Sequence, residues 1–448
     1  MLNNQKGFIL ISVILIMLLM AATVFSINYY SATQLRMASN QSFSVRTSYD
    51  LKAIVEQSDW KLTDNLFWRT VEAGEDYTFN GTTYTRIVRN ADTAPFNYPS
   101  DYSDAVTIQV TSKGATQSFQ RSFRYYVKEI SGLSLNNPSR ISMDSSGNLL
   151  IADTGNHRVL KVNPDTSAVT IIAGTGSKGY DGDGSFTPSF LPRLDNPQSI
   201  CENVSGPSSD NISYYIADSG NDRIREINLT TNIITTVAGG GSAGCSDSPG
   251  NATDAEFISP EDIFNDQLGN LYISDANQNR VCKVNLATNQ IETVVGSCGV
   301  WGSGGDGGAA TNATLGTPTG IFKDSSGNLY IADEPNSNIR KVNTFGIIST
   351  VVSAGISGPA DIVVDGSGNI FIASLWISEI KVVNVDNGNI YALTGGYGDI
   401  VDVPAVDSLL NDPSGIAMAS SYGNRKIFIT DGGNDKIKFL LFKTVYGL

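Results

Sequence analysis

The chain has 448 residues, 41% of them hydrophobic, which is enough for two or three domains with sizeable cores. Its formal net charge of −14 argues against nucleic acid as a partner, because the phosphates would be repelled. The single histidine, His157, argues against a histidine-based zinc or iron site and against a Ser-His-Asp hydrolase.

The first segment, MLNNQKGFILISVILIMLLMAATVFSINYYS, combines one basic residue with a long apolar run. No charged residue lies between Lys6 and Arg36. The stretch from Phe8 to Ile27 would form a helix of roughly 30 Å, which spans the hydrocarbon core of a bilayer. Lys6 would stay in the cytoplasm, so the rest of the chain would face outward.

Three interpretations of this segment are open. A cleaved secretory signal usually has an apolar stretch of only about 7–15 residues, although TVFS would serve as a weak cleavage site. A plain membrane anchor is the second interpretation. The third comes from the short polar leader that ends in Lys6-Gly7 and precedes Phe8, which resembles the prepilin leader of type IV pilins and their type II secretion relatives. That resemblance implies a leader of residues 1–7, cleavage after Gly7 by prepilin peptidase and methylation of Phe8.

One residue departs from the pilin pattern. Type IV pilins usually carry Glu at the fifth mature position, which is Ser12 in this sequence. In the resembling families, subunits without this Glu are mostly minor pilins or pseudopilins at the filament tip. A buried Glu needs a partner, usually the amino terminus of the next subunit, and a tip subunit has no neighbour above it. Ser12 therefore favours a tip or priming role.

Residues 8–72 are predicted to form a transmembrane and assembly helix. No Pro or Gly occurs between Ser31 and Leu62, and a broken apolar stripe runs through that stretch. A helix from Phe8 to about Trp60 would be roughly 80 Å long, which is typical of membrane-plus-assembly helices.

A small sheet is predicted in residues 73–128. Asn80-Gly81 lies between alternating runs in YTFNGTTYTRIVRN, and this dipeptide is a strong hairpin signal. A second hairpin is predicted around Lys113-Gly114. Four antiparallel strands over a helix would give a pilin-like α+β head.

After Pro138 the sequence becomes periodic. DSSGNLLIAD at 144–153 returns as DSSGNLYIAD at 324–333, and weaker copies bring the number of units to six. Each unit contains four short strands separated by Gly-Asn and polar turns, which predicts a six-bladed β-propeller over residues 129–448. The pattern resembles the NHL repeat, above all in GNHRVLKVN at 155–163 and GGDGGAATNATLGTPTGI at 304–321.

The sixth unit lacks an obvious fourth strand of its own. Residues 125–130, within FRYYVKEI, have strand character and precede the first unit, so we expect them to complete the sixth blade and close the ring. Residues 444–448 are the alternative closing strand. The fold class is therefore mainly β, with a propeller preceded by a long helix and a small antiparallel sheet.

Two groups of candidate site residues stand out. Aspartates end the second strand of five units, and we expect each to hold its own turn, with calcium binding as the alternative. The linkers between units are rich in polar and aromatic residues, and we expect them to emerge on one face, where ligands usually bind. The ligand-binding candidates in these linkers are Tyr180, Asp181, Asp183, Trp301 and Asp306.

The cysteines leave the redox compartment open. Their even number permits two disulfides in an exported protein, but the spacing does not fix the pairing, and buried thiols are the alternative. The four are Cys201, Cys245, Cys282 and Cys298.

These patterns predict a minor, tip-type pilin-like subunit that displays a propeller for protein or glycan binding, without catalysis and without a cofactor. It would reside in the inner membrane with the propeller outside, and then join other pilin-like subunits in a filament at the cell surface. A membrane-anchored scaffold or sensor is the first alternative. A propeller lyase or hydrolase is the second, and it is disfavoured because no repeat departs from the pattern toward a ligand cluster.

Overall fold

The computed structural model describes residues 75–79, 82–90, 104–112 and 115–445, apart from 205–211, 244–249, 386–387, 395–409 and 420–425. The predicted leader (1–7) and helix (8–72) lie outside the described residues. Within the described ranges, no helix is long and apolar enough to cross a membrane. The chain divides into two compact units, of which the smaller comprises residues 1–64 and 78–83 and the larger comprises the remainder.

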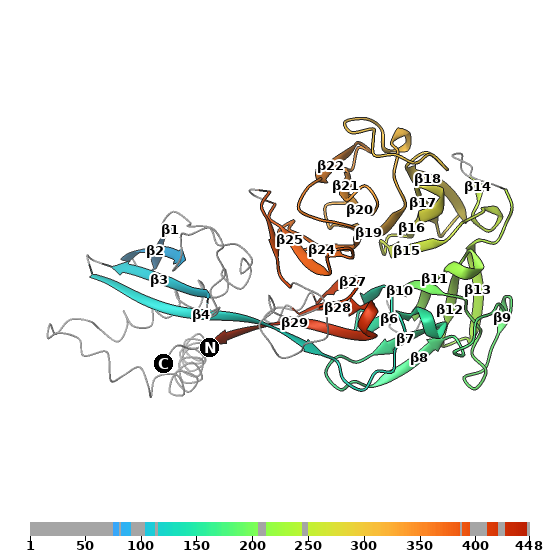
Figure 1. The fold of residues 1–448 in the computed structure, drawn as a ribbon, viewed down its shortest axis with the longest axis horizontal. Coiled ribbons are helices and arrows are strands. Elements are labelled where there is room, and N and C mark those ends of the chain that lie inside the picture. Colours follow the sequence, from blue (N-terminus) through green and yellow to red (C-terminus); the bar gives the residue numbers. More distant parts are fainter. Residues whose placement is uncertain are drawn as a thin grey trace, which may run out of the picture. The chain divides into compact units, whose positions relative to one another are not determined.

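Six antiparallel sheets form the ring in the larger unit (Figure 1). Each blade has four strands, and in the first five blades they follow one another in chain order from the centre of the ring outward. The first blade is β5 (Ile141–Met143), β6 (Leu149–Asp153), β7 (Arg158–Val162) and β8 (Val169–Ala173). The second blade is β10 (Pro197–Val204), β11 (Ile212–Asp218), β12 (Arg223–Asn228) and β13 (Ile233–Gly239). The third blade is β15 (Pro260–Asn265), β16 (Asn270–Asp275), β17 (Arg280–Asn285) and β18 (Gln290–Val295).

The other three blades repeat this order. The fourth is β19 (Pro318–Lys323), β20 (Leu329–Asp333), β21 (Asn338–Val342) and β22 (Ile348–Val352). The fifth is β23 (Pro359–Val364), β24 (Ile370–Ser374), β25 (Glu379–Val383) and β26 (Ile390–Ala392), and the sixth begins with β27 (Pro413–Met418), β28 (Ile427–Asp431) and β29 (Lys436–Val445). Each inner strand contacts the next, and β27 contacts β5, so the ring is closed. The predicted six-bladed propeller is confirmed.

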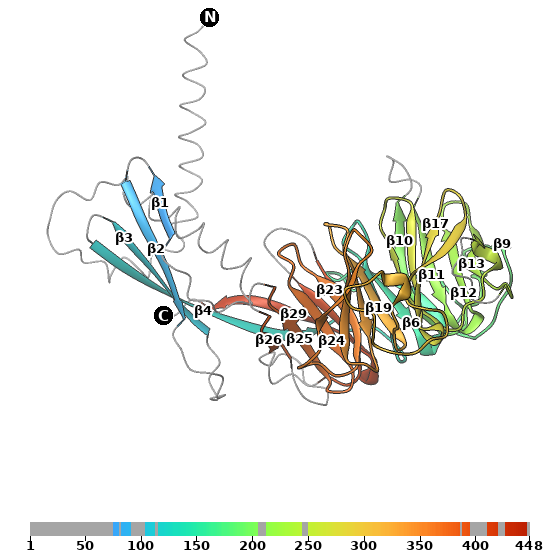
Figure 2. The same ribbon diagram turned by 90° about the horizontal axis from the view of Figure 1, so that it is seen from above.

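The sixth blade is completed by a strand from the N-terminal side. β4 (Ala115–Glu129) pairs antiparallel with β29, from Glu129 opposite Lys438 to Ser122 opposite Val445. The predicted closure by residues 125–130 is therefore confirmed. The first half of β4 pairs with β3 (Asp104–Ser112), so one strand belongs to two sheet regions (Figure 2).

The small sheet consists of the two predicted hairpins. β1 (Glu75–Phe79) and β2 (Thr82–Asn90) flank Asn80-Gly81, while β3 and β4 flank Lys113-Gly114. Together with the sixth blade they give the strand order β1-β2-β3-β4-β29-β28-β27.

The core lies between the blades. The described apolar side chains form six clusters, each of which joins two neighbouring blades. Tyr215 on β11 packs with Ile273 on β16, for example, and Val127 on β4 packs with Phe371 on β24. A single blade buries only one face, so the ring is stable because every blade covers its neighbour.

In the first blade the repeated phrase builds two turns. Asp144 accepts hydrogen bonds from the backbone N–H groups of Ser146 (3.0 Å) and Asn148 (2.7 Å), while Gly147 adopts φ +82°. This geometry favours Asp, Gly and Asn at those positions. After the second strand comes a short turn whose last residue is left-handed, and this residue also contacts the next blade: His157 Nδ1 accepts the Asn196 N–H at 3.1 Å.

The aspartates that end the second strand hold the preceding linker as well as the expected turn, which four of them reach through the side chain of an Asn three residues further on. Each accepts, at 2.7–2.9 Å, a backbone N–H of the linker that leads into its own blade. All five side chains are completely buried: Asp153, Asp218, Asp275, Asp333 and Asp431.

The linkers do not simply emerge on one face of the ring. β9 (Gly184–Ser185) pairs with β13, and β14 (Gly250–Asn251) pairs with β18, so each linker runs along the outer edge of the blade that it enters. In the next linker, Ala309 forms a bridge with Ile347 beside β22. This course shields edge strands that would otherwise expose unpaired backbone groups.

Candidate functional site

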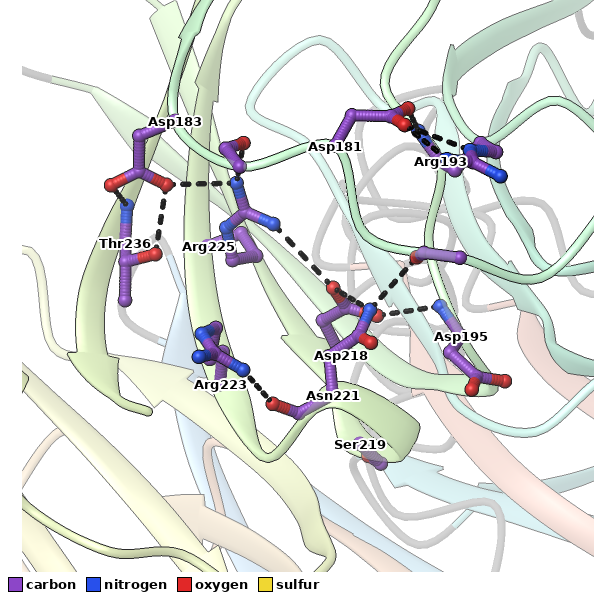
Figure 3. A network of polar contacts seen from close by, with 12 residues as sticks. Asp181, Asp183, Arg193, Asp195, Asp218, Ser219, Asn221, Arg223, Arg225 and Thr236 are labelled. Atoms are coloured by element: carbon purple, nitrogen blue, oxygen red, sulfur yellow. Dashed lines mark hydrogen bonds and ion pairs between the residues drawn. The ribbon is translucent and has the colours of Figure 1, made fainter. Parts of the chain in front are cut away.

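The first predicted linker site is an ion-pair network (Figure 3). Asp183 accepts hydrogen bonds from Arg225 Nη2 (2.9 Å), from the Thr236 N–H (2.9 Å) and from Thr236 Oγ1 (2.8 Å). Arg225 is fully buried and also lies 3.7 Å from Asp218. The Tyr180 ring covers the guanidinium groups of Arg223 and Arg225, at 4.5 and 4.8 Å from its centroid.

Asp181 belongs to the same linker but has a separate partner. It accepts hydrogen bonds from Arg193 Nη2 (2.6 Å) and from the Arg193 N–H (2.8 Å), and these bonds hold the pKa of the Asp181 carboxyl below its usual range. Asp181 and Asp183 thus act on different cations (Figure 3).

The third linker repeats this arrangement around the fourth blade. Asp306 accepts a hydrogen bond from Arg340 Nη2 (2.7 Å) and one from the Thr350 N–H (2.9 Å), while Arg340 lies 3.6 Å from Asp333. Burial opposes ionisation of Asp306, but the bonds from Thr350 and Arg340 lower its pKa below the usual range. In both blades a buried arginine therefore joins a linker aspartate to the aspartate of the turn.

Trp301 is the most exposed of the five predicted residues, with 62% of its surface accessible. It lies beside Gly316, where a Cβ would meet the indole nitrogen at 2.7 Å. Asp181, Asp183 and Asp306 thus hold the linkers, whereas the side chain of Trp301 is largely exposed to solvent. That these residues and Tyr180 bind a ligand stays a prediction.

A second polar cluster, which the sequence did not single out, lies in the centre of the ring. Each unit contributes the second residue after the proline that opens the repeat, at position 138, 197, 260, 318, 359 or 413. Five of these residues are on the innermost strand, and the sixth, Arg140, directly precedes β5. Five of the six strand pairs show a register shift at this point, and such bulges redirect a side chain. The six residues are Arg140, Ser199, Asp262, Gly320, Asp361 and Gly415.

Two of these residues are buried aspartates, each bonded to the following blade. Asp262 accepts hydrogen bonds from Ser199 Oγ (2.7 Å) and the Ile321 N–H (2.8 Å). Asp361 accepts hydrogen bonds from the Ile416 N–H (2.9 Å) and the Ile362 N–H (2.9 Å).

Glycine leaves room for one of these carboxylates. At Gly320, a Cβ would approach the Asp361 carboxylate to 2.6 Å. Any larger residue at that position would therefore displace Asp361 or the strand that carries it.

Arg140 provides the positive charge of this cluster. Its guanidinium is 5% exposed and donates from Nη1 to the Ser414 carbonyl at 2.5 Å. Burial alone would lower the Arg140 pKa, but the charges of Asp361 and Asp262 outweigh it and raise the pKa. Burial raises the pKa of Asp361 to about 7, although Arg140 opposes the shift, and it also raises the pKa of Asp262.

The cluster lines a cavity of about 1160 Å³ to which all six innermost strands contribute. Apolar side chains such as Phe264, Phe322 and Met418 form much of its wall, and Glu202 and Lys426 also line it. Among the described residues, no group of three or more His, Cys, Asp or Glu side chains has a geometry that could hold a metal ion.

Three cysteines fall within the described residues. Cys298 is part of a disulfide, whereas Cys201 is a free thiol beside the cavity and Cys282 is buried in the core between the second and third blades. Burial raises the pKa of the Cys201 thiol far above its ordinary value, so this thiol is unreactive at neutral pH.

The sequence does carry a signal for this cluster. Two residues after the repeat proline, three units have Arg140, Asp262 and Asp361, whereas the other three have Ser or Gly. It is inconspicuous because the surrounding apolar residues keep their period.

Comparisons with known proteins agree with this fold. The NHL repeat model matches residues 135–162, and the Teneurin NHL domain model matches residues 298–395. The chain therefore contains NHL repeats, and they build a six-bladed β-propeller.

Two known proteins are similar to part of this chain. Protein SUPPRESSOR OF QUENCHING 1, chloroplastic, from Arabidopsis thaliana is 26% identical over 217 residues, covering 46% of this chain and 20% of that protein. NHL repeat-containing protein 2 from Gallus gallus is 36% identical over 129 residues, covering 28% of this chain and 16% of its own length. The chain thus spans a fifth or less of these two relatives. A protein of unknown function from Bacteroides thetaiotaomicron has a solved structure that aligns with a TM-score of 0.48 and 14% identity, over 84% of this chain and 98% of that one.

Proposed function

We propose that the chain is a minor, tip-type pilin-like subunit that presents an NHL propeller outside the cell as a binding module. The inner membrane would hold it before prepilin peptidase acts, and other pilin-like subunits would then contact its N-terminal helix. The observation that carries the proposal is the leader Lys6-Gly7-Phe8 ahead of an uncharged apolar run that is long enough to span a bilayer.

Two structural features support an anchored display role. The first half of β4 belongs to the small sheet and its second half closes the sixth blade. The ring is therefore completed by a strand that lies on the N-terminal side of the propeller in the chain. The disulfide at Cys298 suits an oxidising, extracytoplasmic compartment. The net charge of −14 agrees with a partner that is protein or glycan and not nucleic acid.

The mature N-terminus tests this proposal. We expect the full-length protein, produced in a bacterium that has a prepilin peptidase, to begin with N-methylated Phe8 by intact-mass and peptide mass spectrometry. Gly7→Val should block cleavage because the bulky residue lies beside the cut bond. Ala22→Val keeps the apolar run and should be processed as the unmodified chain is.

Each other outcome supports a different function. An intact Met1 in the unmodified protein would contradict pilin processing and favour the membrane-anchored scaffold or sensor. A terminus just after TVFS would show instead that the apolar run is a cleaved secretory signal.

A further inference from the structure

The floor of the central cavity carries buried polar atoms without partners. Arg140 Nε has no hydrogen-bond acceptor, although the side chain is 95% buried, and Glu202 Oε1 has no donor, although Glu202 is only 6% exposed. Both residues line the cavity. Buried polar groups in native proteins almost always have partners, so the free Arg140 N–H can take an acceptor that enters the cavity.

The charges around Arg140 define what is missing. Two buried carboxylates, Asp361 and Asp262, line the cavity together with this single guanidinium. Burial raises the pKa of both carboxyls, although the charge of Arg140 lowers them. When both are ionised, one negative charge is left in surplus over the guanidinium, and a positively charged hydrogen-bond donor would offset it.

The aspartates retain the capacity to accept such a donor. Asp361 Oδ1 accepts a hydrogen bond from the Ile362 N–H and Oδ2 accepts one from the Ile416 N–H, and a carboxylate oxygen can accept two. A metal ion suits this site less well, because no metal-binding group of three side chains exists among the described residues.

The wall next to this floor is apolar. The rings of Phe264 and Phe322 lie 5.5 Å apart edge to face, and Ile321 and Met418 also line the cavity. An apolar substituent would be desolvated there, close to a polar head on the floor.

We propose that the cavity binds the α-amino end of a ligand of the form H₃N⁺–CHR–C(=O)–, such as a peptide N-terminus or an α-amino amide. The ammonium group donates to Asp262 and Asp361, the adjacent carbonyl accepts the free N–H of Arg140, and the apolar R group packs on Phe264 and Phe322. A free amino acid fits less well, because its carboxylate would meet the surplus negative charge. The inference deepens the proposed binding function by naming its ligand class, and it does not depend on pilin processing.

Two small probes test the ligand class on the unmodified, full-length protein in detergent micelles. We expect L-phenylalaninamide to bind at least tenfold more tightly than N-acetyl-L-phenylalaninamide in isothermal titration calorimetry at about pH 7.4. That pH lies between the Asp361 pKa of about 7 and the ordinary α-amino pKa of about 7.7–8.0, so most Asp361 carboxyls are ionised and most α-amino groups are charged. Equal affinities, or no binding of phenylalaninamide at millimolar concentration, would overturn the proposal.

Matched variants locate the site. Asp361→Asn and Arg140→Gln should each weaken phenylalaninamide binding at least tenfold, whereas Glu292→Gln, which removes a charge from the outer strand β18, should leave it unchanged. If Glu292→Gln weakens binding as much as Asp361→Asn does, the ligand does not lie in the cavity. Pilin processing is read separately at residue Phe8, so the failure of either proposal is recognised independently of the other.

Discussion

Buried aspartates take their positive partners from two positions on the third strand. Arg158 and Arg280 begin that strand and pair with Asp153 and Asp275 at 2.6 and 3.0 Å. In three other blades the cation lies two residues further on, as in the pair between Lys438 and Asp431 at 2.7 Å. Successive residues of a strand point to opposite faces. Positions two residues apart therefore lie on the same face, and both can reach the same carboxylate.

The fifth blade shows what happens without the aspartate. Ser374 occupies the position, and Lys381, the residue equivalent to Arg340, pairs instead with Glu379 on its own strand. The cation and the acid therefore change together, which agrees with a structural role for the ring of aspartates.

Arg340, which joins the linker to the turn, should contribute more to the stability of the fold than its exposed partner Asp306. Arg340→Ala leaves Asp333 buried without its cation and should lower the free energy of unfolding by about 3–5 kcal/mol. Asp306→Asn removes a 48%-exposed carboxylate and should cost about 1 kcal/mol or less. Denaturant unfolding followed by circular dichroism measures both, and equal losses would contradict the assigned hierarchy.

The stability of the ring should depend on pH through Asp361. Its pKa of about 7 lies above the unfolded value of about 3.9, so the folded state binds the extra proton between these values. Stability from this group is therefore present below about pH 4 and is lost as the pH rises through 7. Arg140 and Asp262 act on the same proton, so the transition belongs to the cluster.

Asp361→Asn isolates that contribution. The variant should lose less stability than the unmodified protein when the pH is raised from 5 to 8, as measured by the melting temperature. Identical pH profiles would show that Asp361 is ionised in the folded state throughout this range.

At the scale of elements, β4 decides whether the ring is closed. Val127 on this strand is fully buried and lies opposite Leu440. Val127→Asp places a charge in that core and should cost at least about 3 kcal/mol, whereas Lys128→Gln on the exposed side should change stability by about 0.5 kcal/mol or less.

Hydrogen exchange shows whether that loss is local. Protection of the backbone amides should fall first in β27, β28 and β29, because their blade loses its fourth strand. Uniform loss of protection around the whole ring would mean instead that the propeller unfolds as one cooperative unit.

At the scale of the whole molecule, sequence reasoning was strongest for local, repeated features. The Gly-Asn turns, the strand period and the surplus strand at 125–130 are visible within short windows, and they determine the blade number and the closure. The aspartates of the turns were also interpreted correctly, since each acts within its own repeat.

Features that depend on ring closure were harder to predict. Arg140, Asp262 and Asp361 come from the first, third and fifth blades, and only the circular arrangement of the strands brings them to one cavity. The course of the linkers was missed because Asp183 and Asp306 bond to strand residues that lie 34 to 53 residues further along the chain. Their partners, Arg225 and Arg340, look like ordinary strand residues in the sequence.

Mechanical load would reach the propeller through a single strand. If the N-terminal segment is tethered while a ligand pulls on the ring, the tension passes along β4 into its pairing with β29. Antiparallel bonds from Ser122 to Glu129 would then share a shearing force and would not open one after another like a zipper. The pairing that completes the sixth blade would thus resist the detachment of this blade from its outer strand under load.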